Sequence, residues 1–263
     1  MSASEPPRRP TTRPREDALK SVGSTLDVLD CFLADDELGV SEIARALGVA
    51  KSSAHRMLST LLSRGFVEQN PGTGRYRLGL HIYELGQLSI SRSRLRQAAL
   101  PIMEDLRQRT GQTIHLGVAD GPDVVHLERL QSRDGLDLLG AHARRFPTHC
   151  SATGKVLAAF DPSIAEARRR ASFPPITPNS VKSEAEWDAT LVKVRRAGVA
   201  INRDEVANGA MSVAAPIFDN LGRARAALSI VGRTEVMQRS EPQITRLVVE
   251  AARRIGRIVP WQA

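Results

Sequence analysis

The stretch that decides the fold of the N-terminal part runs from Val40 to Gly79. It reads Val40-Ser-Glu-Ile-Ala-Arg-Ala-Leu-Gly48, Val49-Ala-Lys-Ser-Ser-Ala-His-Arg-Met-Leu58-Ser-Thr-Leu-Leu-Ser-Arg-Gly65 and Phe66-Val-Glu-Gln-Asn-Pro-Gly-Thr-Gly-Arg-Tyr-Arg-Leu-Gly79. Apolar residues at helical spacing predict two helices, and Gly48 suits the left-handed residue that ends the first. Ser41 is the expected N-cap of that helix. Turn residues 70–74 between short apolar runs predict a β-hairpin, so the stretch is typical of a winged helix-turn-helix.

The second helix of this stretch has two chemically different faces. Its inward side is expected to consist of Ala54, Leu58, Leu61 and Leu62. The candidate DNA-binding residues on its other side and at its start are Lys51, Ser52, Ser53, His55 and Arg56. Cationic side chains neutralise phosphate, and Ser and His can reach base edges from a helix in the major groove. The alternative is an amphipathic helical hairpin with a solvated polar face.

The hairpin adds two further candidate DNA-binding residues. Arg75 and Arg77 alternate with Tyr76, so both are expected on one side of the second hairpin strand, where they would contact phosphate. Residues 43–92 contain seven basic and two acidic side chains, whereas the whole 263-residue chain has a net charge of +8. The basic excess is therefore densest over this stretch, which favours a polyanionic partner.

The chain is long enough for two domains. We expect a disordered Pro/Arg-rich tail over 1–17, the winged helix-turn-helix domain over 18–79 with a first helix at 18–34, a linker helix at 80–92, and an effector-binding and oligomerisation domain over 93–263. Cys31 and Cys150 lie far apart and are interpreted as reduced thiols of a cytoplasmic protein. No run is apolar enough for a membrane span, and the N-terminus lacks the apolar segment of a signal peptide.

The second domain alternates helical and strand patterns, which predicts an α+β fold with a largely antiparallel mixed sheet. The expected helices are 95–109, 151–160, 163–171, 184–197 and 242–258. The expected strands are 113–119, 124–131, 136–139, 199–202, 212–218 and 224–231.

One segment of this domain, Phe146-Pro-Thr-His-Cys-Ser-Ala-Thr-Gly-Lys-Val156, is suited to an anionic ligand. Ser151 is the expected N-cap of a helix whose first amides, those of Ala152 and Thr153, stay free. Free amides at the positive end of a helix dipole bind a carboxylate or phosphate. An ordinary capped helix without a ligand is the alternative.

An enzyme is a second functional interpretation, with His149 or Cys150 as the reactive group. Adjacent residues of an extended segment point to opposite faces, so these two side chains cannot act on each other. The partner would have to be His115, His126 or His142, which the sequence does not place. These three histidines with His149 and Cys150 are also conceivable zinc ligands, but no metal-binding spacing supports this, and we expect ordinary satisfied or exposed histidines, no metal and no cofactor. A third interpretation is a DNA-binding architectural protein that binds no effector.

The sequence resembles the IclR family of bacterial transcriptional regulators from about Leu19 to Ile258. The resemblance rests on the N-terminal stretch and on Gly198-Val-Ala-Ile-Asn-Arg-Asp-Glu205 with Ser212-Val-Ala-Ala-Pro-Ile-Phe-Asp219. It implies a winged helix-turn-helix, a linker helix and a GAF-like domain that binds small organic acids. It also implies a homodimer or tetramer on palindromic double-stranded operator DNA, and no enzymatic activity. Members of the family repress or activate, and we expect a repressor.

Carried over by position, the resemblance implies an effector pocket in the second domain. Its lining residues would be Leu138, Phe146, Ala152, Thr153, Asn202, Ala210, Ser212, Ser229 and Val231. Asn202 stands where the family usually has Asp, and Val231 where one branch has Ser, so this pocket is less charged. These departures favour an aromatic or longer-chain acid, with the Asn202 amide free to hydrogen-bond to it. Effector binding would be coupled to DNA binding through the linker helix at 80–92.

Overall fold

The computed structural model describes residues 20–132 and 144–261. The chain divides into two compact units, with the division between Arg92 and Ser93. Each unit is described here by itself.

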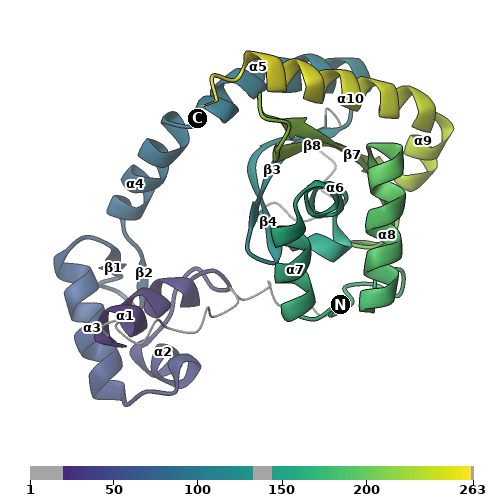
Figure 1. Ribbon diagram of the computed structural model, residues 1–263. Helices are drawn as coiled ribbons and strands as arrows, with labels where there is room; N and C mark the ends of the chain where they lie inside the picture. The colour runs from purple at the N-terminus through teal and green to yellow at the C-terminus, as the bar shows by residue number, and fades with distance from the viewer. Residues whose placement is uncertain (1–19, 133–143, 262–263) are drawn as a thin grey trace. The chain divides into compact units, whose positions relative to one another are not determined.

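The N-terminal unit contains the predicted helices and hairpin (Figure 1). Its elements are α1 (Lys20–Cys31), α2 (Val40–Leu47), α3 (Lys51–Ser63), β1 (Val67–Gln69), β2 (Tyr76–Leu78) and α4 (Leu80–Ser91). Val28, Ile43 and Leu58 from the three helices pack with Val67 and Tyr76 from the hairpin. Strands β1 and β2 pair antiparallel, as predicted.

Two local predictions in this unit are wrong. Helix α2 is not capped by Ser41: its N-cap is Gly39, two residues earlier, and the Glu42 carboxylate accepts a 2.6 Å hydrogen bond from the Gly39 amide. A carboxylate near a helix start also interacts favourably with the helix dipole. Leu62 is 39% exposed, because the stripe that faces the core is the narrower one of Ala54, Leu58 and Leu61. Gly48 does adopt the predicted left-handed conformation, with φ 63°.

Helix α4 lies within one residue of its predicted bounds. The structure describes all of its residues, and none of them is buried. Its large exposed apolar side chains are Leu80, Tyr83, Leu85, Leu88 and Ile90.

The C-terminal unit is built on an antiparallel sheet with the order β5-β4-β3-β8-β7-β6. Its strands are β3 (Thr113–Asp120), β4 (Asp123–Leu130), β5 (Arg145–Pro147), β6 (Ala200–Arg203), β7 (Ala210–Phe218) and β8 (Ala224–Arg233). Its helices are α5 (Arg94–Thr110), α6 (Ala152–Phe160), α7 (Pro162–Arg170), α8 (Glu184–Ala197), α9 (Thr234–Arg239) and α10 (Glu241–Ile258), and a 3₁₀ turn covers Thr148–Cys150. The α+β fold and the antiparallel sheet are as predicted.

Three elements of this unit were not predicted, namely β5, the 3₁₀ turn and α9. Each spans six residues or fewer, which is too short for a periodic apolar pattern. The predicted strand at 136–139 lies outside the described residues.

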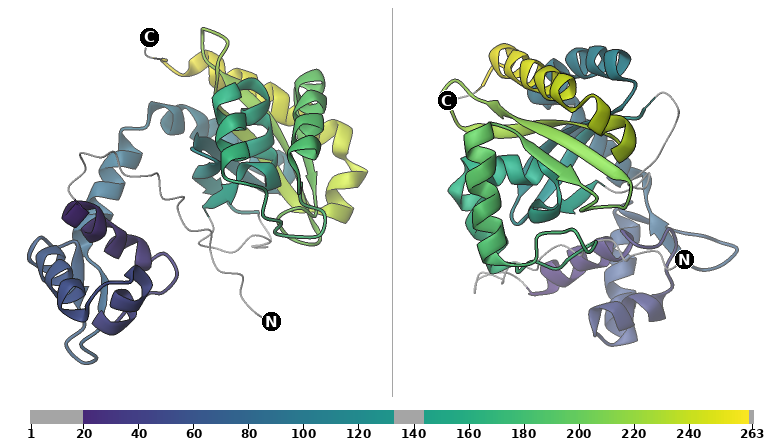
Figure 2. Two further views of the ribbon diagram at one scale, coloured as in Figure 1. Left: turned by 60° about the horizontal axis from the view of Figure 1, so that its bottom comes forward. Right: turned by 90° about the vertical axis from the view of Figure 1, so that its right-hand side faces the viewer.

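The sheet separates two apolar layers (Figures 1 and 2). Helices α5 and α10 lie side by side on one face, where Met103 and Val248 pack against Ile114 and Leu116 of β3. Helices α6 and α8 lie on the other face, where Trp187 packs with Ala214 and Ala227. Because strand residues alternate between faces, His115 and Gly117 of β3 belong to the α6 side. The polar strand residues His115, Ser212 and Ser229 thereby lie by the start of α6.

Candidate functional site

The polar side of α3 is exposed to solvent. Lys51, Ser52, Ser53, His55 and Arg56 are all exposed, while Ala54 and Leu58 on the other side of the helix are fully buried. The start of α3 has no side-chain cap, so its first amides remain available to an anion. The five residues therefore form one continuous surface, which suits contact with a nucleic acid.

The two hairpin arginines have different surroundings. The Arg77 guanidinium is 56% exposed and lies 3.1 Å from the Glu68 carboxylate on the paired strand. Arg75 lies 2.8 Å from the Glu42 carboxylate and donates a 2.8 Å hydrogen bond to the Glu37 carbonyl. Arg75 therefore ties the hairpin to α2, whereas Arg77 pairs with Glu68 inside the hairpin and stays half exposed to solvent.

A cavity lies between the sheet and the start of α6. Its lining includes eight of the nine predicted effector residues: Phe146, Ala152, Thr153, Asn202, Ala210, Ser212, Ser229 and Val231. The ninth, Leu138, lies outside the described residues. Five further lining residues were not predicted: His115, His126, Ser151, Val206 and Met211. The space open to a water molecule is about 20 Å³, which is room for about one water, so an organic acid enters only if lining residues move apart.

Strand register brings the polar lining residues together. His115 on β3 pairs with Ser229 on β8. Val231 pairs with Ser212 on β7, and Ser212 in turn pairs with Asn202 on β6. Residues paired across strands have neighbouring side chains on one face, so these groups form a continuous floor.

The helix start above this floor has the predicted cap. Ser151 Oγ accepts a 3.0 Å hydrogen bond from the Gly154 amide. Among the described residues, no protein acceptor meets the amides of Ala152 and Thr153. A Cβ at residue 154 would lie 2.3 Å from Thr148 Cα, so only glycine allows the 3₁₀ turn to pack this closely on α6. The sequence thus produces a helix start with two free donors at the cavity.

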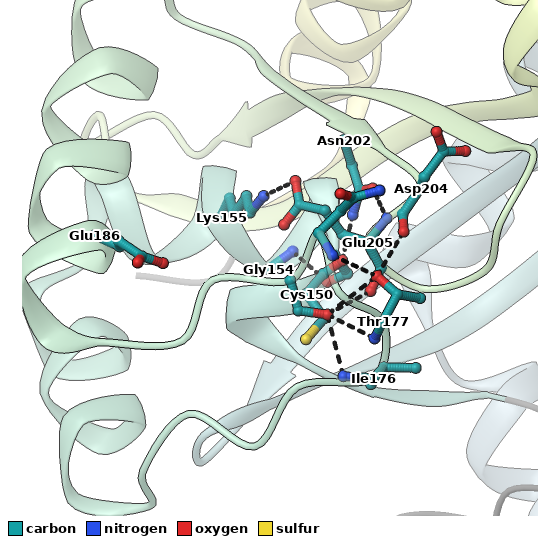
Figure 3. A network of polar contacts seen from close by, with 12 residues as sticks. Cys150, Gly154, Lys155, Ile176, Thr177, Glu186, Asn202, Asp204 and Glu205 are labelled. Atoms are coloured by element: carbon teal, nitrogen blue, oxygen red, sulfur yellow. Dashed lines mark hydrogen bonds and ion pairs between the residues drawn. The ribbon is translucent and has the colours of Figure 1, made fainter.

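Asn202 lines the cavity, but its amide already has partners in the protein. Its Nδ2 donates to the Cys150 carbonyl, and its Oδ1 accepts a 3.2 Å hydrogen bond from the Glu205 amide (Figure 3). The Glu205 carboxylate forms an ion pair with Lys155 of α6, whose side chain is only 4% exposed. Asn202 therefore holds the segment before α6 in place instead of offering the free amide expected from the sequence.

His115 and His126 lie against each other in the cavity wall, contrary to the expectation of ordinary histidines. Their ring centroids are 4.2 Å apart, and His126 Nε2 lies 3.4 Å from Thr153 Oγ1. Burial, together with the charges of Arg129 and Arg144, lowers the pKa of His126 to about 3. Burial, followed by the neighbouring His126 and the same two arginines, lowers the pKa of His115 well below its usual value. Both rings are therefore neutral at pH 7. His115 was not placed from the sequence; strand alternation next to the apolar Ile114 and Leu116 is the signal that could have placed it on this face.

The surroundings of His149 and Cys150 do not favour nucleophilic chemistry. His149 Nε2 is bonded to the Pro174 carbonyl at 3.0 Å, and burial lowers its pKa to about 4. Burial raises the pKa of the Cys150 thiol, so this group stays protonated at pH 7. Within residues 20–132 and 144–261, no three His, Cys, Asp or Glu side chains are placed to hold a metal ion. None of the helices described in the structure is long and apolar enough to cross a membrane.

Two family models match the chain. The IclR helix-turn-helix domain matches residues 21–71, and the bacterial transcriptional regulator IclR C-terminal domain matches residues 87–257. The HTH-type transcriptional regulator XynR of Escherichia coli K12 is 34% identical over 218 residues, covering 81% of this chain and 85% of the relative. The glycerol operon regulatory protein of Streptomyces coelicolor is 34% identical over 224 residues, covering 84% and 88%.

Solved structures resemble the chain over most of its length. The IclR transcriptional regulator of Alicyclobacillus acidocaldarius has a TM-score of 0.80 and 26% identity, and the match covers 91% of this chain and 98% of that one. An IclR homologue from Microbacterium hydrocarbonoxydans, solved in complex with 4-hydroxybenzoate, has a TM-score of 0.78 and 29% identity, with coverage of 90% and 98%.

Proposed function

Because the chain belongs to the IclR family of bacterial transcriptional regulators, we propose that it is a repressor whose operator binding is controlled by a small organic acid. The relatives are transcriptional regulators and not enzymes, so the enzyme interpretation of His149 and Cys150 is excluded. The protein acts on DNA through the N-terminal unit, and a small-molecule effector binds in the C-terminal unit.

One observation carries the effector part of the proposal: the residues expected from the resemblance meet at a single cavity, directly at the start of α6. The free amides of Ala152 and Thr153 point to a carboxylate, which gains from the helix dipole as well. Phe146 and Val231 provide apolar contact for the rest of the acid. The 4-hydroxybenzoate in the Microbacterium structure is itself a carboxylic acid, which supports this ligand class.

The DNA part of the proposal uses the exposed side of α3. Its first turn enters the major groove, with Lys51, Ser52, Ser53, His55 and Arg56 toward the DNA and Arg77 on phosphate. The chain acts as a homodimer or tetramer on palindromic operators. The exposed apolar residues of α4, such as Leu80, Tyr83 and Leu88, are the surface proposed to pair with a second copy.

The first experiment measures binding to DNA from the region upstream of the chain's own gene, with and without a panel of aromatic and aliphatic acids. A ligand-controlled repressor releases this DNA when the right acid is added. Equal binding with and without every acid would favour the architectural interpretation.

The second experiment tests carboxylate binding at α6 by calorimetry on the Ala152→Pro variant. Proline at the first helical position removes only an amide that has no helical partner, and Ser151 already has an extended conformation compatible with a following proline. Ala152→Val is the matched control, since it adds similar bulk but keeps the amide. Affinity should fall in Ala152→Pro relative to Ala152→Val; equal affinities would contradict carboxylate docking on this helix.

A further inference from the structure

Helix α10 has one side that faces away from the sheet (Figure 2). Its buried side belongs to the apolar layer against the sheet and consists of Ile244, Val248, Ala251, Ala252 and Ile255. The opposite side presents four exposed arginines, called here the arginine ridge: Arg246, Arg253, Arg254 and Arg257. At 3.6 residues per turn, Arg246, Arg253 and Arg257 point within about 40° of one another, away from the sheet.

The four arginines of the ridge have no partner in the part of the chain that the structure describes. None of them has a carboxylate or a carbonyl within bonding distance, whereas Arg107 on α5 and Arg169 on α7 each pair with a carboxylate at 2.6 Å. Glu250 is the one acidic side chain among the four arginines, so four positive charges and one negative leave the ridge with a net +3. Helix α8, by contrast, has three acidic and three basic side chains.

The helix dipole does not account for this arrangement. A cation interacts favourably with the negative end of a helix only within the last turn. Arg257 lies in the last turn of α10, whereas Arg246 and Arg253 lie before it. Like charges one turn apart, such as those of Arg253 and Arg257, repel each other. Because an anion bound across the ridge would relieve that repulsion, the ridge favours a partner of negative charge.

The length of the ridge favours a polymer over a small ion. Arg246 and Arg257 are separated by about 16 Å along the helix axis, from a rise of about 1.5 Å per residue. A small anion meets only neighbouring guanidinium groups, and such contacts are weak on an exposed surface. One strand of double-stranded DNA has a phosphate about every 3.4 Å along its axis, so several phosphates lie within reach of the ridge.

A groove beside the ridge would suit a different partner. It has a volume of about 570 Å³, and its lining includes Arg253 and Arg257 with the aromatic rings of Phe218 and Trp261. An acidic peptide would place an apolar side chain there. Arg246 and Arg254, however, do not line this groove, so a peptide seated in it leaves half of the ridge unused. The whole ridge fits the backbone of DNA better, and DNA is the polyanion that the family binds through its helix-turn-helix domain.

We propose that the arginine ridge of α10 is a second DNA-binding surface, which contacts the phosphate backbone without reading the base sequence. This goes beyond the proposed function, in which only the N-terminal unit contacts DNA. Each exposed contact is weak alone, but DNA already held by the N-terminal unit is present at a high effective concentration. The ridge therefore adds affinity for every sequence alike, while α3 chooses the operator.

Titrations of the full chain at several salt concentrations test the proposal. The probes are the DNA fragment upstream of the chain's own gene and a random-sequence duplex of the same length. The variant Arg253→Gln/Arg257→Gln should bind both probes about tenfold or more weakly than wild type at about 100 mM salt. The slope of log affinity against log salt should become shallower by about two, because two phosphate contacts are lost.

Lys193→Gln/Arg196→Gln is the matched control, because it also removes two exposed cations, from α8 on the opposite face of the sheet. Its affinity should stay within about twofold of wild type, with an unchanged salt slope. Arg253→Lys/Arg257→Lys keeps both charges and should retain affinity and slope, since a phosphate needs only a cation. The ratio of affinities for the two probes should be the same in all of these proteins, because the ridge does not read bases.

Three results would overturn the proposal. Equal losses in the α10 and α8 glutamine variants would show that only the net charge of the protein attracts DNA. A loss confined to the upstream fragment would show that the ridge reads sequence. An unchanged salt slope in the α10 glutamine variant would exclude phosphate contacts; if the peptide (Asp-Glu)₄ then binds wild type but not this variant, the ridge and groove take an acidic peptide instead.

A second measurement needs no variant. Phenylglyoxal modifies exposed arginines, and bound DNA should protect Arg253 and Arg257 of the wild-type protein from it, but not Arg196. Equal modification with and without DNA would refute contact at the ridge. A chain that binds the upstream fragment and releases it with an acid, yet shows no protection, loses this second surface and keeps the proposed function.

Discussion

The buried state of His126 predicts a specific loss of stability in acid. Its pKa is about 3 in the folded protein, against an ordinary value of about 6.5 in an unfolded chain. Between these values the unfolded state binds a proton that the folded state does not. Above about pH 6.5 the ring is neutral in both states, and this group does not reduce the free energy of unfolding. Below that pH the free energy of unfolding falls as the pH decreases toward about 3. At pH 5 the loss amounts to about 2 kcal/mol.

The measurement compares wild type with His126→Phe, which cannot take up that proton. Urea unfolding of the ligand-free protein is followed at pH 8 and pH 5 through tryptophan fluorescence, because both tryptophans, Trp187 and Trp261, belong to the C-terminal unit and Trp187 is fully buried. Carboxylates and the histidines remote from His126 titrate in both proteins and cancel in the difference. His115, which contacts His126, is lowered in pKa first by its own burial, and that cause is kept in the variant. Wild type should lose about 2 kcal/mol more than His126→Phe between the two pH values. A difference below about 0.5 kcal/mol would refute the argument that His126 is buried in its neutral form.

The remaining predictions concern DNA binding and the support of α6. Arg56→Ala should weaken operator binding by about 1–3 kcal/mol in titrations at fixed salt if the residue contacts a base, and unchanged affinity would remove it from the interface. Arg77→Ala should weaken binding to all sequences alike and reduce the slope of log affinity against log salt by about one; a loss at one base pair only would contradict a phosphate contact. Arg75→Ala should lower the melting temperature of the N-terminal unit, because it releases the hairpin from Glu42, and an unchanged melting curve would count against that tie. Asn202→Asp should lower the free energy of unfolding by about 2–4 kcal/mol, since a carboxylate cannot donate to the Cys150 carbonyl, and an equally stable variant in urea titrations would contradict the bond.

The helices and their ends followed from local sequence. The spacing of Ala54, Leu58 and Leu61 predicts the buried side of α3, and these residues are buried because a stripe at that spacing faces one direction. Gly48 and Gly111 end α2 and α5 in the left-handed conformation, and Ser151 caps α6. These features depend on residues within about one helical turn, so the sequence contains the necessary information.

The cavity could be predicted from the sequence only in part. Ser212, Ser229 and Val231 were placed in a pocket by resemblance, and strand alternation brings them to the same face as Ala152 and Thr153 of α6. Periodicity alone does not reveal which strands become neighbours: β8 lies between β3 and β7, although β3 and β8 are more than a hundred residues apart in the chain.

The sequence by itself determined the helix-turn-helix, the order of most strands and helices, and the family to which the chain is related. Only the tertiary structure decided that Arg75 of the hairpin meets Glu42 of α2. It also decided that Asn202 bonds to Cys150, 52 residues away, and that His115 and His126 meet as a neutral pair. The physical reason is that hydrogen-bond partners and the burial of charge depend on which distant segments pack together, and neither has a local signal in the chain.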